Sequence, residues 1–170
     1  GGNTGKWAIA SARFSPDIHV TIVDLPGQLE FAKREVEANG LQEQVSFIAA
    51  NVLDETVELP RGYDAIWMSQ FLDCFSEDQI VSILKRCYRA LDDNGYVFIM
   101  EPLWDKQKLE VAAFCLQQTS LYFTAVANGN SQMYSAAVFF ACIKNAGFEI
   151  VEETNNIGLS QSLLKCKKMK

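Results

Sequence analysis

The sequence Gly1-Gly2-Asn3-Thr4-Gly5-Lys6-Trp7, read together with Val20-Thr21-Ile22-Val23-Asp24-Leu25-Pro26, decides the fold of this 170-residue chain. A glycine-rich turn that opens a helix lets backbone N–H groups approach a ligand closely, and an acid about 20 residues later can bind a ribose diol. The two stretches therefore predict a nucleoside-cofactor site. Nicotinamide, flavin and S-adenosylmethionine proteins all use versions of this turn, and a tight strand-to-helix turn without a ligand is the simpler alternative.

The composition is that of one globular α/β domain, with 49% hydrophobic and 21% charged residues. The net charge of -6 argues against a nucleic-acid or anionic-membrane surface, because both favour clustered Lys and Arg. The five cysteines are widely spaced and odd in number, which indicates reduced core thiols rather than disulfides or a zinc site. With no signal-peptide pattern and no membrane-spanning run, we expect a soluble, cytoplasmic protein that binds a small molecule.

A glycine turn of this kind normally follows a buried strand, yet no residue precedes Gly1. We therefore expect the chain to be the C-terminal piece of a longer polypeptide. The first, central strand of the sheet would then lie upstream.

Strand and helix patterns alternate along the first 103 residues. Apolar periodicity predicts helices over residues 4–14, 28–39 and 76–91 and strands over 18–23, 45–50, 63–72 and 96–103. This alternation predicts a Rossmann-like parallel sheet with right-handed crossovers and helices on both faces. A long helix over 108–126, a helix over 135–145 and two antiparallel closing strands over 148–153 and 159–166 follow, and we interpret the Lys-rich end as a solvated tail.

Polar residues stand where the predicted parallel strands end. Asp24 is placed where a ribose would lie, since open parallel sheets bind ligands beyond the carboxyl ends of their strands. It is also a candidate N-cap for the next helix. Asn51 ends the next strand, where its amide could bind an adenine edge or form an ordinary turn. Met68 and Ser69 reach the same edge.

The order of these segments resembles the catalytic domain of class I S-adenosylmethionine-dependent methyltransferases. The stretches that carry the resemblance are the glycine turn, VDLP (23–26), AANVLD (49–54), YDAIWMSQFLDCFSEDQ (63–79) and LDDNGYVFIMEPLW (91–104). The chain is most similar to the small-molecule O-methyltransferases of the plant caffeate and bacterial hydroxyneurosporene or polyketide type. This resemblance implies S-adenosyl-L-methionine as cofactor, no metal, and an N-terminal dimerisation domain outside this chain, hence a homodimeric full-length protein.

The resemblance also implies which residues bind the cofactor. They are Gly1, Gly2 and Gly5 at the methionine part, Asp24 and Leu25 at the ribose, Asn51 and Val52 at the adenine, and Met68 and Ser69 near the sulfonium. Asn51 and Ser69 depart from the family pattern. Family members have an Asp in place of Asn51, and plant members often have a Lys in place of Ser69.

The departure with the largest consequence is Asp73. Family members usually carry His-Asp-Trp where this chain has Asp73, Cys74 and Phe75, and their His removes the proton from the substrate hydroxyl. His19, the only histidine, opens the second strand at the opposite edge and is a poor base candidate. Proton transfer from a phenol to an ordinary carboxylate is uphill by about 6 pKa units, roughly 8 kcal/mol.

Three interpretations of Asp73 remain open. Burial could raise its pKa and make it a base, the substrate could be an easier nucleophile, or the protein could bind cofactor without the usual chemistry. The ordinary alternative is that Asp73 is an exposed turn residue beside the cap of the next helix. Alignment of the reacting atoms can supply about 7 to 11 kcal/mol without any base.

The predicted function is S-adenosylmethionine-dependent methyl transfer to a hydroxyl of a small aromatic molecule. Four residues of the late helical region are candidates for the acceptor pocket, with core packing as the alternative for each: Phe114, Gln118, Tyr122 and Met133. A cofactor-binding but non-catalytic protein is the second hypothesis. A nicotinamide-dependent oxidoreductase is the third, and the closing strands and the lack of a Tyr-x-x-x-Lys pattern count against it.

Overall fold

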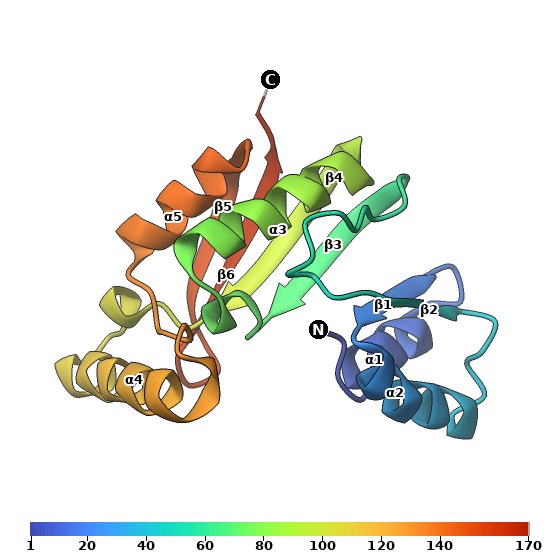
Figure 1. The fold of residues 1–170 in the computed structure, drawn as a ribbon, viewed down its shortest axis with the longest axis horizontal. Coiled ribbons are helices and arrows are strands. Elements are labelled where there is room, and N and C mark those ends of the chain that lie inside the picture. Colours follow the sequence, from blue (N-terminus) through green and yellow to red (C-terminus); the bar gives the residue numbers. More distant parts are fainter. Residues whose placement is uncertain (170) are drawn as a thin grey trace. The chain divides into compact units, whose positions relative to one another are not determined.

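The computed structural model describes residues 1–169, except for the side chains of residues 127 and 128. The chain divides into two compact units, Gly1–Val57 and a second unit that begins at Glu58 (Figure 1).

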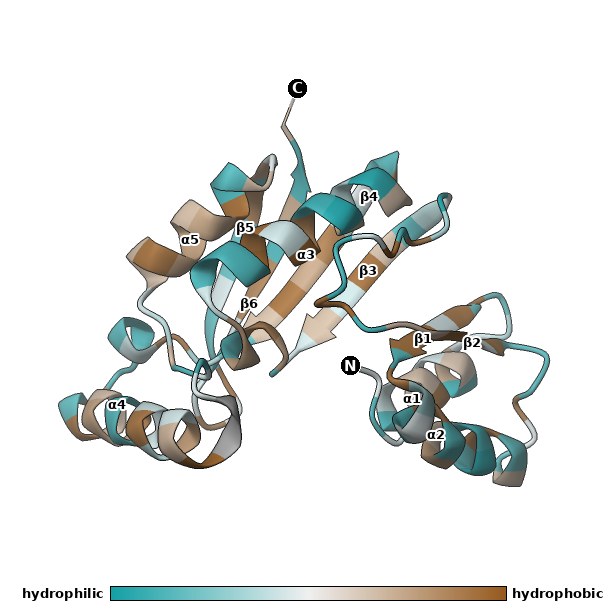
Figure 2. Cartoon of the chain, in the orientation of Figure 1, coloured by the Kyte–Doolittle hydropathy of each residue, from teal (hydrophilic) through white to brown (hydrophobic). Residues whose placement is uncertain are grey.

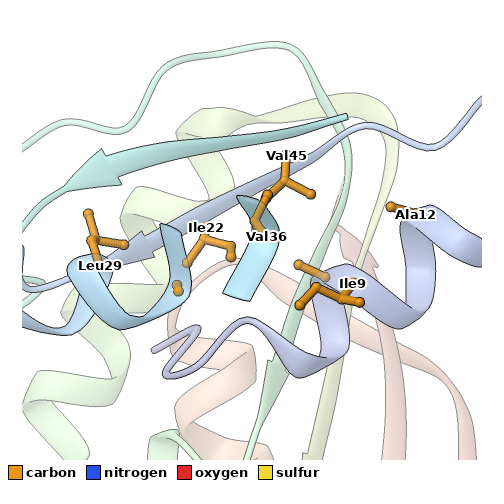
Figure 3. Packing of buried hydrophobic residues seen from close by; sticks show 8 residues of the cluster. Ile9, Ala12, Ile22, Leu29, Val36 and Val45 are labelled. Atoms are coloured by element: carbon orange, nitrogen blue, oxygen red, sulfur yellow. The ribbon is translucent and has the colours of Figure 1, made fainter. Parts of the chain in front are cut away.

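The first unit is a pair of parallel strands packed against two helices. Strands β1 (Val20–Asp24) and β2 (Val45–Ala49) pair in register, and helices α1 (Lys6–Phe14) and α2 (Pro26–Ala38) supply the apolar partners. Figure 3 shows the core side chains Ile9, Ala12, Ile22, Leu29, Val36 and Val45 converging between these elements. Each fully buried Leu, Ile or Val contributes about 1.5 to 3 kcal/mol, so the helical spacing of these residues holds the unit together.

The second unit is a four-stranded sheet. Its strands are β3 (Tyr63–Ser69), β4 (Leu91–Glu101), β5 (Phe148–Ile157) and β6 (Gln161–Lys168), in the order β3-β4-β6-β5. Strands β3 and β4 are parallel, whereas β6 runs antiparallel to both β4 and β5. The predicted antiparallel closing strands are therefore confirmed.

Helices α3 (Glu77–Ala90) and α5 (Ala136–Asn145) pack side by side on this sheet (Figure 1). A capping box starts α3, with the side chains of Ser76 and Gln79 bonded to each other's backbone. Figure 2 shows much of the outer side of α3 as hydrophilic, while Ile80, Leu84 and Cys87 are buried beneath it. The helix is amphipathic in the way that its spacing predicts.

Shorter elements surround the end of the sheet. They are the 3₁₀ turns η1 (Leu72–Cys74) and η2 (Trp104–Lys106), the helix α4 (Glu110–Phe123) and the π-helical turn η3 (Thr124–Asn128). Helix α4 has no buried residue among those that the structure describes. Of the helices within residues 1–169, none combines the length and the apolar character needed to cross a bilayer.

The predicted mixed α/β architecture is confirmed, with two local differences. Residues 92–95, between the predicted helix 76–91 and the predicted strand 96–103, belong to β4 because Leu91 already pairs with Tyr63. The prediction of a solvated Lys-rich tail is wrong for Lys167 and Lys168, since β6 continues to Lys168, whose Nζ lies 3.1 Å from Oδ1 of Asp93. Within the described residues, β1 pairs with β2 and β3 with β4, and the expected upstream strand stays a prediction.

Candidate functional site

The glycine turn packs tightly on strand β1. The N–H of Gly5 donates to the carbonyl of Gly2 at 2.9 Å, and Gly5 adopts φ 76° as the N-cap of α1. A Cβ atom at Gly2 would lie 2.2 Å from Cγ2 of Ile22. Glycine is therefore required at this position for the turn to pack against β1.

Asp24 ties the glycine turn to the end of β1. Its Oδ2 accepts a hydrogen bond from the N–H of Asn3 at 2.9 Å, and its Oδ1 accepts one from the N–H of Leu25 at 2.8 Å. The N-cap position of α2 is Leu25, so the alternative role of Asp24 as the cap is wrong. An ionised carboxylate has about four lone-pair sites, and two backbone bonds leave acceptor capacity for a ribose diol.

Asn51 lies at the same end of the strand pair as Asp24, because the N–H of Ala50 donates to the carbonyl of Asp24 at 2.9 Å. The side-chain oxygen of Asn51 accepts a hydrogen bond from the N–H of Leu53 at 3.0 Å. This Asx turn confirms the turn-forming alternative, and the adenine role stays a prediction. Leu25 is exposed beside Asp24, and Val52 is half-buried.

In the second unit, Met68 and Ser69 occupy the carboxyl end of β3. Met68 is buried and pairs in register with Ile99, so its side chain belongs to the sheet core. Ser69 is half-buried and lies on the opposite face of the strand. At these two positions, the Ser69 side chain and the Met68 backbone are therefore the groups that a cofactor could contact.

Glu101 holds the turn that carries Asp73, a role that the sequence-based prediction did not assign. It ends β4 and is only 2% exposed. Its Oε1 accepts hydrogen bonds from the N–H groups of Phe71 and Leu72, both at 2.8 Å, while its Oε2 has no hydrogen-bond partner within the described residues. The sequence signal that could have indicated this role is the single acid that follows the apolar run Tyr96–Met100.

The carboxyl groups of Asp73 and Glu101 share an environment that disfavours negative charge. Burial, and after it the charge of Asp73, raise the pKa of Glu101 to about 8. Burial also raises the pKa of Asp73, against the lowering effect of hydrogen bonds from the Cys74 thiol and the backbone. Because Asp73 is more exposed than Glu101, Glu101 is the member that holds a proton near neutral pH, and the two groups titrate together.

Residues 131–134 connect the Asp73 turn to helix α4. The N–H of Gln132 donates to the Asp73 carbonyl at 2.9 Å, and the N–H of Met133 donates to Oγ of Ser120 at 2.6 Å. The buried Tyr134 hydroxyl donates to the Phe75 carbonyl at 2.6 Å. Asp73 and α4 are therefore neighbours in one framework of backbone hydrogen bonds.

Of the four predicted acceptor residues, Met133 lies in this framework, whereas the other three lie on the side of α4 away from Ser120, about 120 to 160° around the helix axis. Phe114, Gln118 and Tyr122 follow one another at intervals of four residues on one side of α4, and all three are exposed. The alternative that these three pack into the core is wrong for the described residues. Met133 is half-buried and is brought to the helix by its bond to Ser120.

Comparisons with known proteins show which sequences and folds this chain is similar to. A family model described as the O-methyltransferase domain matches residues 1–149. The chain is 24% identical over 148 residues to an L-tyrosine C(3)-methyltransferase of Streptomyces lavendulae, covering 87% of this chain and 39% of that protein. It is 34% identical over 108 residues to a 3-hydroxy-5-methyl-1-naphthoate 3-O-methyltransferase of Streptomyces sahachiroi, covering 64% of this chain and 31% of that protein.

Among solved structures, the apo form of the S-adenosylmethionine-dependent methyltransferase SibL matches with a TM-score of 0.84 and 27% identity. The match covers 100% of this chain and 49% of SibL. The chain thus spans 31% to 49% of the length of these three proteins.

Proposed function

The chain belongs to the O-methyltransferase domain family, and from this premise we propose that it is the cofactor- and acceptor-binding part of an S-adenosyl-L-methionine-dependent methyltransferase. The acceptor is a hydroxyl group of a small aromatic molecule. The two relatives described above are named for tyrosine and for a hydroxynaphthoate, both of them phenols. Family membership removes the nicotinamide-dependent oxidoreductase from consideration.

The observation that carries the proposal is the bond between Asp24 and the glycine turn. The turn keeps backbone N–H groups close to β1 where a Cβ at Gly2 would collide with Ile22, and Asp24 retains acceptor capacity for a diol. These residues fit S-adenosylmethionine, which supplies a methyl group on a positively charged sulfur. Gly1, Gly2, Gly5, Asp24 and Leu25 would hold it.

Asp73 takes the proton of the acceptor hydroxyl in this proposal. Burial raises the pKa of its carboxyl and so brings it nearer to that of a phenol. The bonds from Gln132 and from Glu101 to the Asp73 turn fix its position before the acceptor binds. General-base assistance contributes typically about 10² to 10⁴ in rate, and positioning contributes the larger share of catalysis.

A non-catalytic, cofactor-binding role is the second candidate, because an Asp stands where the family has its His. Here Asp73 would only complete the turn before α3. Product formation separates the two candidates, since only the first predicts it.

The full-length protein is, in this proposal, a cytoplasmic homodimer. All five cysteines are free thiols, which suits a reducing compartment. Exposed apolar side chains of α4 and of the following turn η3, including Leu121 and Val126, support a further polypeptide surface over this region. Light scattering of the full-length protein at micromolar concentration tests the dimer.

Titration of the full-length protein with S-adenosylhomocysteine tests the proposed function. We expect Asp24→Ala to weaken binding about 10- to 100-fold, the loss that one or two bonds to a charged acceptor would cause. Asp17→Ala, which changes an exposed acid of the same unit, is the matched control and leaves binding unchanged. Absence of binding to the wild-type protein at high micromolar ligand would refute the proposal, and mass spectrometry of products from a pool of phenols then tests transfer.

A further inference from the structure

The turn that carries Asp73 is held from two directions. On one side, Glu101 accepts hydrogen bonds from the two backbone N–H groups that precede that of Asp73, both at 2.8 Å. On the other side, the bonds come from residues 131–134, here called the linking segment. The N–H of Gln132 in this segment donates to the carbonyl of Asp73 at 2.9 Å. Because the peptide group is planar, this bond orients the backbone that leaves Asp73.

Two side chains of the linking segment also bind the turn. The Tyr134 hydroxyl donates to the carbonyl of Phe75 at 2.6 Å, and the side chain of Ser131 forms a hydrogen bond with the thiol of Cys74. Both side chains are buried, since Tyr134 is 4% and Ser131 is 5% exposed. The linking segment thus bonds to each residue from Asp73 to Phe75, and a shift of the segment would displace all three.

The linking segment has no regular secondary structure of its own. Residues 130–135 are neither helix nor strand, so hydrogen bonds to neighbouring elements determine where the segment lies. Two of these bonds involve hydroxyl groups outside it. Oγ of Ser120 in α4 accepts from the N–H of Met133 at 2.6 Å, and Oγ1 of Thr124 in η3 donates to the carbonyl of Ser131 at 2.6 Å. The position of the segment therefore depends on α4 and η3.

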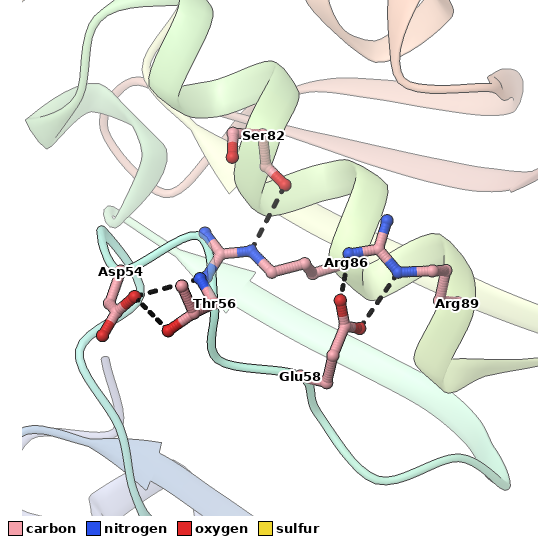
Figure 4. A network of polar contacts seen from close by, with 6 residues as sticks. All are labelled: Asp54, Thr56, Glu58, Ser82, Arg86 and Arg89. Carbon is pink, nitrogen blue, oxygen red and sulfur yellow. Dashed lines mark hydrogen bonds and ion pairs between the residues drawn. The ribbon is translucent and has the colours of Figure 1, made fainter.

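Helix α3, which follows the Asp73 turn, is fixed by contacts of its own. Arg89 binds Glu58 through two bonds of 3.0 and 2.7 Å, and Nε of the buried Arg86 bonds to the Ser82 carbonyl of the same helix (Figure 4). These bonds do not involve the linking segment. A change in the segment is therefore expected to reach the turn without loosening α3.

We propose that Ser120 and Thr124 are positioning residues for the Asp73 turn. Their hydroxyl groups fasten the linking segment to α4 and η3, and the segment in turn fixes the backbone of Asp73. Helix α4 has no buried side chain among those that the structure describes, so these polar bonds are what its packing does not supply. The catalytic consequence rests on the proposed function, in which Asp73 is the base, and misplacing a reacting group by about 1 Å can cost about 10² in rate.

Removal of one hydroxyl tests the inference on the full-length protein. Ser120→Ala deletes the acceptor of the Met133 N–H, and alanine is a better helix former than serine, so α4 itself is not weakened. We expect kcat to fall at least about tenfold and KM for S-adenosylmethionine to change less than about twofold, since the hydroxyl bonds to no residue assigned to the cofactor.

Two further variants make the kinetic test specific to the Ser120 hydroxyl. Ser120→Thr keeps a hydroxyl at the same position and is expected to retain kcat to within about threefold. Thr119→Ala is the matched control, because the Thr119 hydroxyl donates to the Cys115 carbonyl of its own helix at 2.8 Å. Its loss should leave kcat unchanged.

Hydrogen exchange measured by mass spectrometry gives a readout that does not need the reaction. In Ser120→Ala and Thr124→Val we expect exchange to accelerate in the linking segment and also in residues 71–75, where the N–H groups of Cys74 and Phe75 close the turn. Valine keeps the branched shape of threonine but lacks the hydroxyl. Exchange within α3 is expected to stay as in the wild type.

Each outcome bears on the inference separately from the proposed function. Faster exchange in residues 71–75, with a loss of kcat that Ser120→Thr restores, supports the inference. Faster exchange confined to the linking segment overturns it, as does an equal loss of kcat in Thr119→Ala. If the wild-type protein transfers no methyl group to any phenol, the proposed function fails, and exchange in residues 71–75 alone then decides whether the two hydroxyls position the turn.

Discussion

The buried carboxyl of Glu101 accepts a hydrogen bond from the backbone N–H of Leu72 at 2.8 Å, one residue before Asp73. The same oxygen binds the N–H of Phe71 at 2.8 Å. A residue at the end of β4 therefore sets the backbone of the turn after β3. Because neither N–H group is satisfied by the 3₁₀ turn itself, the position of Asp73 depends on Glu101.

Removal of the Glu101 carboxyl is predicted to destabilise the protein strongly. Glu101→Ala leaves two buried N–H groups without an acceptor, at about 1 to 3 kcal/mol each, so we expect a loss of about 2 to 5 kcal/mol of unfolding free energy. Glu101→Gln keeps a carbonyl oxygen for both bonds and should lose less than about 1 kcal/mol. Urea denaturation at pH 6 measures both. Equal losses in the two variants would show that the two bonds do not hold the turn.

The stability contributed by Glu101 is predicted to fall as the pH rises. Its pKa is about 8 in the folded protein and near the ordinary 4.5 in the unfolded chain. Between these values the folded state binds the proton that the unfolded state has released, so the contribution is complete below pH 4.5 and is lost as the pH rises through 8. The raised pKa of Asp73 acts in the same direction.

Urea unfolding between pH 5.5 and 8.5 measures this dependence. The unfolding free energy of the wild type should decrease relative to that of Glu101→Gln across this range. Groups with lowered pKa, such as Glu153 beside Lys106, lose their contribution only at lower pH and leave the comparison intact. Parallel curves for the two proteins would contradict the prediction.

Much of this site could be predicted from the sequence because its residues are fixed by local signals. The glycine turn and Asp24 follow from spacing and from the end of a strand, and the structure brings Asn3 onto Asp24. Glu101 could not be assigned in this way. Its role depends on the parallel register of β3 and β4, which places Glu101, at the end of β4, beneath the turn that follows β3.

The Lys-rich end was misjudged for a similar reason. Composition suggested a solvated tail, but Lys167 pairs with Glu149 across the antiparallel strands β6 and β5, and its Nζ lies 3.2 Å from Oε1 of that residue. Lys168 bonds to Asp93 at 3.1 Å. Long-range partners of this kind carry no signal in a local window of sequence.

Replacement of Asp73 is predicted to reduce methyl transfer without weakening cofactor binding. Asp73→Asn preserves the size of the side chain and the backbone bond to Gln132 but removes the base, so we expect kcat to fall about 10²- to 10⁴-fold. Asp78→Asn, an exposed acid in the first turn of α3, is the control and should change kcat less than twofold. Retention of full activity by Asp73→Asn would show that the reaction proceeds by positioning alone.

A methyl group at Gly2 is predicted to disrupt the cofactor turn. In Gly2→Ala the new Cβ would lie 2.2 Å from Cγ2 of Ile22, so the turn must move away from β1 and the bond from Asn3 to Asp24 is stretched. We expect S-adenosylhomocysteine to bind at least about tenfold more weakly, since the loss of one charge-assisted bond costs about 1.5 to 3 kcal/mol. Gly27→Ala is the matched control: its Cβ meets nothing within 4 Å, and the residue lies in α2, where Ala is favoured. Calorimetric titration of both variants decides the matter, because unchanged affinity in Gly2→Ala would mean that the contact between the turn and β1 does not shape the cofactor site.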